Sequence, residues 1–319
     1  VSGSSVGNTV TTGSVTIPMM KKAGYKPEFA GAVEASASTG GQIMPPIMGA
    51  AAFLMAEYMN VTYGEVALRA ILPAVLYFTG IFISVHLEAR KLGLKGLERS
   101  QLPKMGKLMR KIYLLTPLVV LVWLVTTNTR TMQFSASIAI VCAIVVSLFD
   151  KDNRITVAKI LEALEAGGKS AITVAVACSM AGVISGCITA TGLASKLISA
   201  VVSVSNSVSF MDPTFVALFL TMICCIILGM GVPTTANYCI MASTCAPILI
   251  TIGVPKMAAH FFVFYFGIVA DITPPVALAA YAGSAIAKGN PMKTGINATK
   301  LAIGAFIVPY IFCMNPAML

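Results

Sequence analysis

An internal duplication at an offset of 229 residues constrains the fold of this chain more than any other feature. The residues that match at this offset are ones that shape a backbone: Asn8 with Asn237, Pro18 with Pro247, Gly24 with Gly253, and Pro45-Pro46 with Pro274-Pro275. In an apolar chain, hydrophobic segments that Gly and Pro interrupt at matching positions in two halves are typical of secondary transporters. In such proteins the binding site lies where the interrupted elements meet.

The composition places these segments in a membrane. Hydrophobic residues make up 57% of the chain and charged residues 11%, and the mean hydropathy is +0.87. Soluble domains carry about 25% charged residues, so this chain cannot cover a water-facing surface. No sustained two-residue alternation suggests barrel strands, and we therefore expect an all-α polytopic membrane protein. The eight cysteines lie in apolar stretches, where we interpret them as packing residues without a disulfide framework.

The pattern predicts two re-entrant hairpins and two broken helices as inverted repeats. We expect the first hairpin over 1–20, with a tip at Ser2–Asn8, and the second over 214–250, with a tip at Gly229–Asn237. A broken helix follows each hairpin, over 27–58 with the break at Pro45-Pro46, and over 257–287 with the break at Pro274-Pro275.

Further helices complete the expected architecture. We expect membrane spans over 66–85, 112–125, 132–149 and 301–313, an amphipathic surface helix over 150–169, and a polar loop over 203–212. We also expect an apolar segment over 171–202, interrupted by Gly186 and Gly192. As domains, we expect a transport module with its first repeat at 1–62, scaffold helices and basic loops at 63–170, a second repeat at 171–300, and a terminal helix at 301–319.

The positive charges predict the orientation. The segments 21–26, 86–111, 150–170 and 288–300 hold 18 of the 22 Lys and Arg residues. Alternating spans place all four segments on one side, which the positive-inside rule assigns to the cytoplasm. This arrangement puts the two hairpins on opposite sides of the membrane, as inverted repeats require. The net charge of +10 is therefore interpreted as a topology signal and not as a nucleic-acid surface.

The tips and breaks are the candidate binding elements. Non-helical backbone inside a membrane is tolerated where it lines a cavity or is covered by protein. Hydroxyl, amide and freed carbonyl oxygens suit a cation such as Na⁺, and the N-termini of the half-helices after Pro46 and Pro275 suit an anionic substrate group.

A few titratable residues in apolar surroundings stand out. Asp271 lies in the second break, where a carboxylate suggests ion or proton coupling or, alternatively, a cap on the resumed helix. Glu34 has either a coupling role or a structural hydrogen-bonding role. We interpret His260 as a packed or interfacial residue, and Lys196 and Lys256 as side chains that reach the membrane surface.

Signatures of catalysis are missing from the sequence. The Gly-rich tips lack the Lys-Ser/Thr ending of a phosphate-binding loop, and the chain has no metalloprotease helix. We therefore expect a protein that is not an enzyme and that has no cofactor.

The tips and breaks also resemble a known family, the large membrane subunits of tripartite ATP-independent periplasmic (TRAP) transporters. The resemblance rests on Gly3–Asn8, Ile17–Tyr25, Ala37–Pro46, Gly229–Thr235 and Asp271–Pro275. The form of the last motif resembles the TAXI-type branch, in which the small and large membrane subunits are fused. The resemblance thus implies that this chain is the C-terminal part of a longer protein.

The resemblance implies an elevator-type carrier that takes up a small organic anion, such as a carboxylate, with coupling to Na⁺ or H⁺. It implies a periplasmic substrate-binding protein and a small membrane subunit as partners, and the inner membrane of a bacterium or archaeon as the location. By position, it assigns one cation site to Ser2, Gly3, Ser4, Ser5, Asn8 and Gln42. It assigns a second to Gly231, Pro233, Thr234, Thr235, Asn237 and Asp271, with Pro45, Pro46, Thr273, Pro274 and Pro275 shaping the breaks. Glu34 and Asp271 leave a proton mechanism open.

Two other readings remain open at this stage. A dicarboxylate elevator carrier that needs no binding protein has the same hairpin architecture, and partner dependence would separate the two. A channel can also be built from duplicated broken helices, but it would not accumulate its substrate against a gradient.

Overall fold

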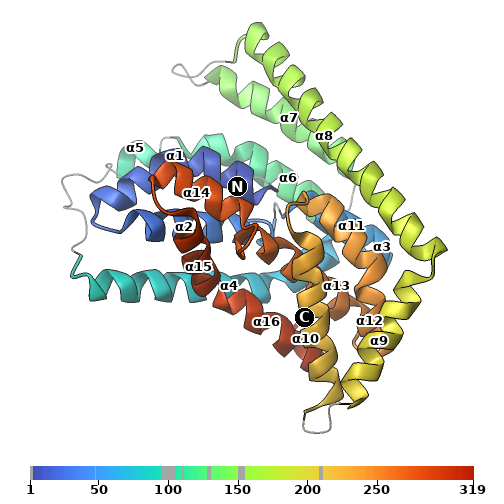
Figure 1. Cartoon of the computed structure of the whole chain (residues 1–319). Coiled ribbons are helices and arrows are strands. Elements are labelled where there is room, and N and C mark those ends of the chain that lie inside the picture. Colours follow the sequence, from blue (N-terminus) through green and yellow to red (C-terminus); the bar gives the residue numbers. More distant parts are fainter. Residues whose placement is uncertain are drawn as a thin grey trace. The chain divides into compact units, whose positions relative to one another are not determined.

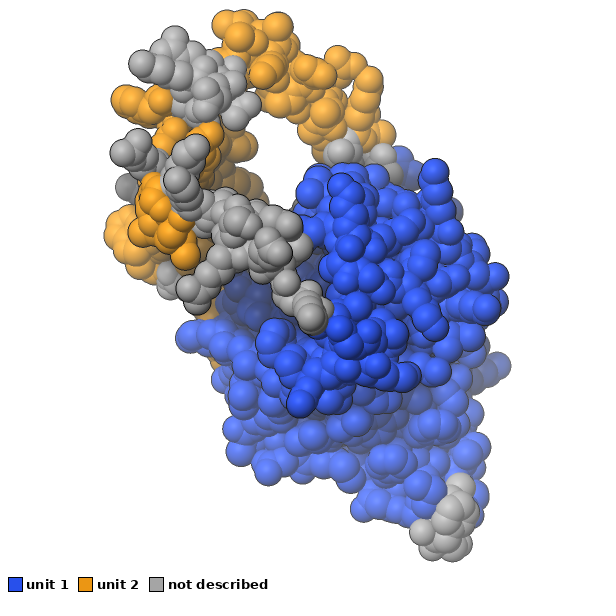
Figure 2. All heavy atoms as spheres, turned by 90° about the vertical axis from the view of Figure 1, so that its left-hand side faces the viewer, with its two compact units in different colours: residues 1–61, 66–95, 176–319 blue, residues 62–65, 96–175 orange. Residues whose placement is uncertain are grey.

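The computed structural model describes residues 3–46, 48–94, 105–109, 111–127, 131–149, 155–207 and 211–319. Within these ranges the chain is helical and has no strand, which confirms the all-α class (Figure 1). It divides into two compact units (Figure 2). Unit 1 comprises residues 1–61, 66–95 and 176–319, and unit 2 comprises residues 62–65 and 96–175.

The first interrupted segment of unit 1 contains α1 (Ser5–Lys22), α2 (Pro27–Gly40) and α3 (Ala50–Met59). Ser4 caps α1 by accepting a hydrogen bond from the Gly7 N–H. Pro27 occupies the first turn of α2, where its missing N–H costs nothing. Gly24, at a φ of +105°, forms the turn between the two helices. The expected break is present between α2 and α3, and its Pro45-Pro46 peptide bond is cis.

The second interrupted segment reproduces these boundaries at the same offset. It contains α11 (Thr234–Thr244), α12 (Ala246–Thr251), α13 (Lys256–Val269), the short 3₁₀ helix η3 (Ala270–Ile272) and α14 (Leu278–Ala287). The starts of α11 and α13 match those of α1 and α2, and the ends of α12 and α13 match the ends of α1 and α2. Gly253 again forms a turn at positive φ, and the Pro274-Pro275 bond is again cis.

Each broken helix has its two halves in two different groups of helices. Helix α2 packs against α1, α14 and α15 (Pro291–Leu301), so the second half of one broken helix completes the group of the other. Conversely, α3 packs against α11 and α13 (Figure 1). We call α1, α2, α14 and α15 the first bundle, and α3, α10 (Pro213–Gly229), α11, α12, α13 and α16 (Ile303–Met314) the second bundle.

Each bundle has its own kind of packing. In the first bundle the α2 and α14 backbones meet at Gly31 and Gly283, where a Cβ on Gly283 would lie 2.7 Å from the Gly31 carbonyl oxygen. In the second bundle α13 is buried on every side, and Phe261, Phe262 and Phe266 are fully covered. A helix that is apolar all round belongs at the centre of its bundle.

The remaining helices of unit 1 include the longest apolar segments. Helix α4 (Tyr63–Lys91) contacts α2 through the Tyr77 hydroxyl, which donates to the Ser36 carbonyl oxygen at 2.7 Å. Helix α10 begins after Asp212, whose side chain accepts from the Thr214 and Phe215 N–H groups. In the described part of the chain, α4 and the α15–α16 pair (291–314) are long and apolar enough to span a membrane, and a third candidate is the bent pair 178–190 and 195–205.

Unit 2 is built from shorter helices. It contains α5 (Met105–Met109), η2 (Ile112–Leu115), α6 (Thr116–Thr126) and α7 (Met132–Phe149), and α6 packs against α7. Spans were expected over 112–125 and 132–149, and these segments are apolar helices (η2 with α6, and α7) that are shorter than the candidate spans of unit 1. Helix α8 (Val157–Ala190) begins in unit 2 and ends in unit 1.

Several boundaries predicted from the sequence were wrong. The expected surface helix and the following apolar segment form one helix, α8, and Gly186 lies inside it. Only Gly192, at a φ of +66°, ends a helix there, and α9 (Leu193–Ser207) then extends into the expected polar loop. Helix α4 continues past residue 85 to Lys91. The final span is longer than expected, since α15 and α16 together run from Pro291 to Met314, with η4 (Pro316–Met318) following.

The predicted tips are also shorter than expected. Helix α1 begins at Ser5 and α11 begins at Thr234, so Asn8, Thr235 and Asn237 lie in first helical turns. Only Met230–Pro233 separates α10 from α11. A Ser or Thr residue followed by small residues is compatible with a helix start as well as with an unwound loop, because the hydroxyl can cap the helix.

Candidate functional site

The first tip lies against the first break. A Cβ placed on Gly3 would lie 2.9 Å from the Gly49 Cα atom, so the two backbones are in direct contact. The Gly49 N–H donates to the Gln42 carbonyl oxygen at 3.1 Å, which folds the break back on itself. Gly3, which the resemblance grouped with Gln42, thus lies against the break that contains Gln42. Ser2 lies outside the described residues.

The same tip also reaches the second break. The Ser5 hydroxyl donates to Asp271 Oδ2 at 2.5 Å, and both side chains are buried. Ser5 begins α1, whereas Asp271 belongs to η3, so this bond joins elements that lie 266 residues apart. The grouping made from the sequence had assigned these residues to different sites. The structure thus brings both breaks to one tip.

Gln42 is the least satisfied side chain in this region. It is fully buried, and neither its amide nitrogen nor its amide oxygen has a hydrogen-bond partner among the described residues. A buried amide without partners is costly, and most native amides of this kind are paired with protein or with water. Gln42 is therefore a candidate ligand for an ion or a substrate group. It occupies the position that matches Asp271 at the offset of 229.

Asn237 resembles Gln42 in this respect. Its Nδ2 donates to the Gly267 carbonyl oxygen at 3.0 Å, while its Oδ1 has no partner in the described part of the chain. Close packing fixes the side chain, because a Cβ on Gly229 would lie 2.7 Å from Asn237 Nδ2. An oxygen held in this way is preorganised to accept a cation or a donor. Gly231, at a φ of +75°, and Pro233 shape the exposed turn before it, and Thr234 and Thr235 are half-buried.

Hydrogen bonds hold the second break in shape. The Thr273 hydroxyl donates to the Val269 carbonyl oxygen at 2.8 Å, and the Thr299 hydroxyl donates to the Ile272 carbonyl oxygen at 3.1 Å. The Tyr281 hydroxyl donates to the carbonyl oxygen of Pro275. Among the described residues, no side chain caps the N-termini of α3 and α14, so their first N–H groups are candidates to bind an anion.

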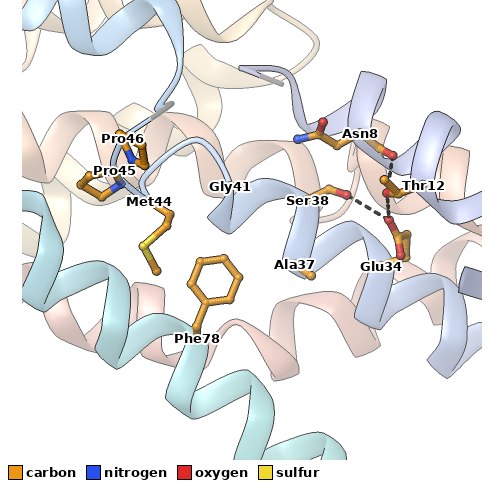
Figure 3. Close-up of a pocket in the computed structure, with 10 residues that line it drawn as sticks. All are labelled: Asn8, Thr12, Glu34, Ala37, Ser38, Gly41, Met44, Pro45, Pro46 and Phe78. Carbon is orange, nitrogen blue, oxygen red and sulfur yellow. Dashed lines mark hydrogen bonds between the residues drawn. The ribbon is translucent and has the colours of Figure 1, made fainter. Parts of the chain in front are cut away.

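A cavity of about 420 Å³ lies beside the first break (Figure 3). Its wall contains residues of α1 and α2, Phe78 of α4 and the break itself, including Asn8, Pro45 and Pro46. Glu34 points into this cavity with Thr12 and Ser38 beside it. The cavity combines an apolar wall with one carboxylate, as many small-ligand sites do.

Hydroxyl groups surround Glu34. Thr12 donates to Oε1, Thr16 donates to Oε2 at 2.5 Å, and Ser38 lies 3.4 Å from Oε1. The Thr12 and Thr16 hydroxyls also lie within 2.8 and 3.0 Å of carbonyl oxygens of α1, so each hydroxyl proton has two possible acceptors. An ionised Glu34 would take both protons, whereas a protonated Glu34 would release one of them to the backbone. The network therefore accommodates both protonation states.

The sequence did not identify Thr12, Thr16 or Ser38. A usable signal existed, because Thr12 and Thr16 are four residues apart on one helix and Glu34 and Ser38 are four apart on the next. Single hydroxyls in apolar helices are common, however, so this spacing alone has little specificity. Phe78 and Gly49 carried no signal.

Three other residues singled out from the sequence, His260, Lys256 and Lys196, have packing or surface positions. His260 is buried, and its Nδ1 lies 2.8 Å from the Tyr238 hydroxyl, consistent with a packed residue. Lys256 donates to the Met59 carbonyl oxygen at 3.3 Å and thereby supports the end of α3. Lys196 is exposed. In the ranges that the structure describes, no three His, Cys, Asp or Glu side chains are placed to hold a metal ion together.

Comparison with known proteins gives a match along the whole chain. The model of the family described as "Tripartite ATP-independent periplasmic transporter, DctM component" matches residues 1–319. A relative from Vibrio cholerae serotype O1, the "C4-dicarboxylate TRAP transporter large permease protein DctM", is 34% identical over 90 residues. The aligned stretch covers 28% of this chain and 19% of that relative.

Proposed function

This chain belongs to the family of DctM components of tripartite ATP-independent periplasmic (TRAP) transporters, and we propose that it carries out ion-coupled uptake of a small dicarboxylate. The family consists of transporter components and not of enzymes. The substrate class follows the name of the Vibrio cholerae relative, a C4-dicarboxylate TRAP transporter large permease protein. The resemblance stated from the sequence is confirmed at the level of the family.

One observation supports a binding site between the two breaks. The first tip touches the first break through Gly3 and Gly49, and the second break through Ser5 and Asp271. Beside it lies the unpartnered amide of Gln42. Broken helices that meet at a substrate and ion site are a recurring feature of secondary transporters.

The available groups suit both a cation and an anion. The amide oxygens of Gln42 and Asn237 and the backbone carbonyls of the breaks are hard ligands of the kind that Na⁺ takes in such sites. The uncapped N-termini of α3 and α14 offer N–H groups and a positive dipole end to a carboxylate. We propose Na⁺ as the coupling ion, with the amides as ligands.

A proton is the alternative coupling ion. Among the described residues Glu34 forms no ion pair, and its hydroxyl partners can hydrogen-bond either the ionised or the protonated carboxyl. In the part of the chain that the structure describes, Asp271 accepts a side-chain hydrogen bond from Ser5. Proton coupling through these two carboxyls therefore stays a second candidate.

The larger assembly is part of the proposal. We propose that the chain works in the inner membrane with a periplasmic substrate-binding protein and a small membrane subunit, fused upstream as in the TAXI-type branch. The helix boundaries that match at an offset of 229 residues support inverted repeats that move as an elevator. A dicarboxylate carrier without a binding protein has the same features.

Uptake into proteoliposomes tests the proposal. The full-length protein would be reconstituted with its small subunit, and labelled succinate would be supplied outside with or without the purified binding protein. Inward Na⁺ and H⁺ gradients would be imposed separately, at the same membrane potential. Accumulation that needs both the binding protein and the Na⁺ gradient is expected.

The other outcomes separate the alternatives. Accumulation driven only by the H⁺ gradient would show that H⁺, and not Na⁺, is the coupling ion. Glu34 and Asp271 would then be the groups that bind the proton. Accumulation without the binding protein would identify a partner-free carrier. Equilibration without accumulation under every gradient would refute coupled transport and indicate a channel.

A further inference from the structure

A second cavity, with a different character, lies at the lysine-rich end of unit 1. It has a volume of about 670 Å³, and α2, α4 and α15 line it. Lys26, Lys91, Lys293 and Lys300 contribute to its wall together with Glu28 and Glu88. Four positive and two negative side chains give this cavity a net charge of +2. We call it the lysine cavity.

The two carboxylates leave half of the positive charge uncompensated. Glu88 lies 3.8 Å from Lys91, with which it forms an ion pair. Glu28 accepts from the Asn290 N–H at 3.4 Å. Its own N–H and that of Asn290, together with Lys293 and Lys26, lower its pKa, so the carboxylate stays ionised at neutral pH. In the described part of the chain, Lys293 and Lys300 come within 4 Å of no carboxylate.

Exposed apolar side chains lead away from the cavity along both flanking helices. On α4, Leu87, Ile83 and Leu76 are 57%, 51% and 39% exposed. Going back from Lys91, each residue of this series lies about one or two helical turns before the previous one. On the other flank, Ile296, Ile303 and Ile307 are 43%, 52% and 52% exposed. They lie on one face of the α15–α16 pair, in register with Lys300. In a membrane these faces contact acyl chains.

A cluster of lysines above two lipid-facing stripes matches one chemical class of ligand. A phosphate group binds well where several Lys side chains converge, and basic pockets between membrane helices on the cytoplasmic side bind anionic headgroups. The first turn of α2, which also lines the cavity, adds the positive end of a helix dipole. A soluble phosphate would use the lysines but not the stripes.

We propose that the lysine cavity binds the phosphate of an anionic phospholipid in the cytoplasmic leaflet, with the acyl chains along α4 and the α15–α16 pair. The bound lipid holds α4 to the first bundle through α2 and α15. This inference does not rest on the transported substrate or on the coupling ion. It predicts a lipid site even in a protein that has lost all transport.

The test uses purified full-length protein in detergent from which native lipid has been removed. Phosphatidylglycerol, phosphatidylcholine or sodium phosphate is added, and bound lipid is counted by native mass spectrometry while the melting temperature is followed. We expect phosphatidylglycerol to bind and to raise the melting temperature, and the other two to leave it unchanged. The double variant K293Q/K300Q should bind phosphatidylglycerol on the order of 30-fold more weakly, because each lysine near an anionic surface contributes roughly a factor of five.

Two further variants serve as controls. K159Q/K196Q removes the same charge from exposed lysines elsewhere and should keep the binding. K293R/K300R keeps the charge and should retain it as well, which separates loss of the site from misfolding. Unchanged selective binding in K293Q/K300Q would overturn the proposal. An equal, lysine-dependent shift with sodium phosphate would overturn the lipid as the ligand and identify a soluble phosphate site.

Discussion

The contact between Gly31 and Gly283 supports a sharp prediction about stability. A Cβ on Gly283 would lie 2.7 Å from the Gly31 carbonyl oxygen, and one on Gly31 would lie 2.9 Å from the Gly283 carbonyl oxygen. Ordinary contacts of this kind begin near 3.4 Å, so Gly283→Ala must push the α2 and α14 backbones apart by about 0.7 Å. Neither obstacle is a flexible side chain, so the helices themselves have to move.

The expected cost follows from overpacking. Inserting one methyl group into a well-packed contact costs about 1–3 kcal/mol, and a backbone obstacle places this site toward the upper end. Replacing Gly with Ala within a helix gains roughly 0.5–1 kcal/mol, which offsets part of the cost. We therefore expect Gly283→Ala to lower the free energy of unfolding by about 1–2 kcal/mol. The double variant with Gly31→Ala should cost less than the sum of the single variants, because one displacement relieves both clashes.

Thermal unfolding in detergent, followed by the fluorescence of a fused reporter, measures the effect. Gly80→Ala is the matched control, because Gly80 also lies inside a helix, α4, and a Cβ there meets nothing within 4 Å. The control should melt at the same temperature as the unmodified protein or slightly higher. A Gly283→Ala variant as stable as the Gly80→Ala control would refute the close approach of α2 and α14.

Three further predictions concern the breaks and a helix cap. Asp271→Asn should abolish ion-driven uptake while membrane insertion stays normal, because the amide keeps the shape but loses the charge; normal accumulation in proteoliposomes would contradict its coupling role. Gln42→Leu should weaken the dependence of uptake on Na⁺ at least ~10-fold without lowering the melting temperature, since the buried amide has no partner to lose among the described residues; unchanged Na⁺ dependence would remove Gln42 from the site. Asp212→Ala should lower the melting temperature more at pH 7 than at pH 3. The Thr214 and Phe215 N–H groups lower the pKa of Asp212, so its contribution is present above the unfolded pKa and fades as pH falls through the folded pKa; an equal loss at both pH values would contradict this cap.

The sequence predicted the broken helices well because their boundaries depend on local chemistry. Pro27 suits the first turn of a helix, and two consecutive prolines at 45–46 and 274–275 strongly favour an interruption. Gly24 and Gly253 mark turns at positive φ for the same local reason. These features need no knowledge of the rest of the chain.

Helix α8 shows where local reasoning failed. The charged residues before Lys169 predicted a separate surface helix, yet Ala, Leu, Glu and Lys all favour helix, and the pair Gly167-Gly168 did not end it. Lys169 and Glu165 form an ion pair at 2.6 Å across these glycines. A helix boundary needs a competing conformation as well as a weak helix former, and nothing nearby supplies one.

The arrangement of the candidate site lay beyond sequence reasoning altogether. The contact of Ser5 with Asp271 and the packing of α3 with α11 depend on which bundle each half-helix joins. The residues of a half-helix record which face is apolar but not which partner covers that face. The sites assigned by position kept the residues of each repeat together, so Ser5 was grouped with Gln42 and not with Asp271. In the structure, the last helix of each repeat packs in the bundle of the other repeat.

This exchange also has a consequence for biosynthesis. Helices α1 and α2 leave the ribosome before their partner α14, which follows about 240 residues later. At about 5–20 residues per second, the first bundle waits roughly 12–50 s for its last helix. During that interval the surface of α2 around Gly31 has no permanent neighbour. The nascent chain must therefore be sheltered by lipid, by other helices or by the insertion machinery until α14 has been synthesised.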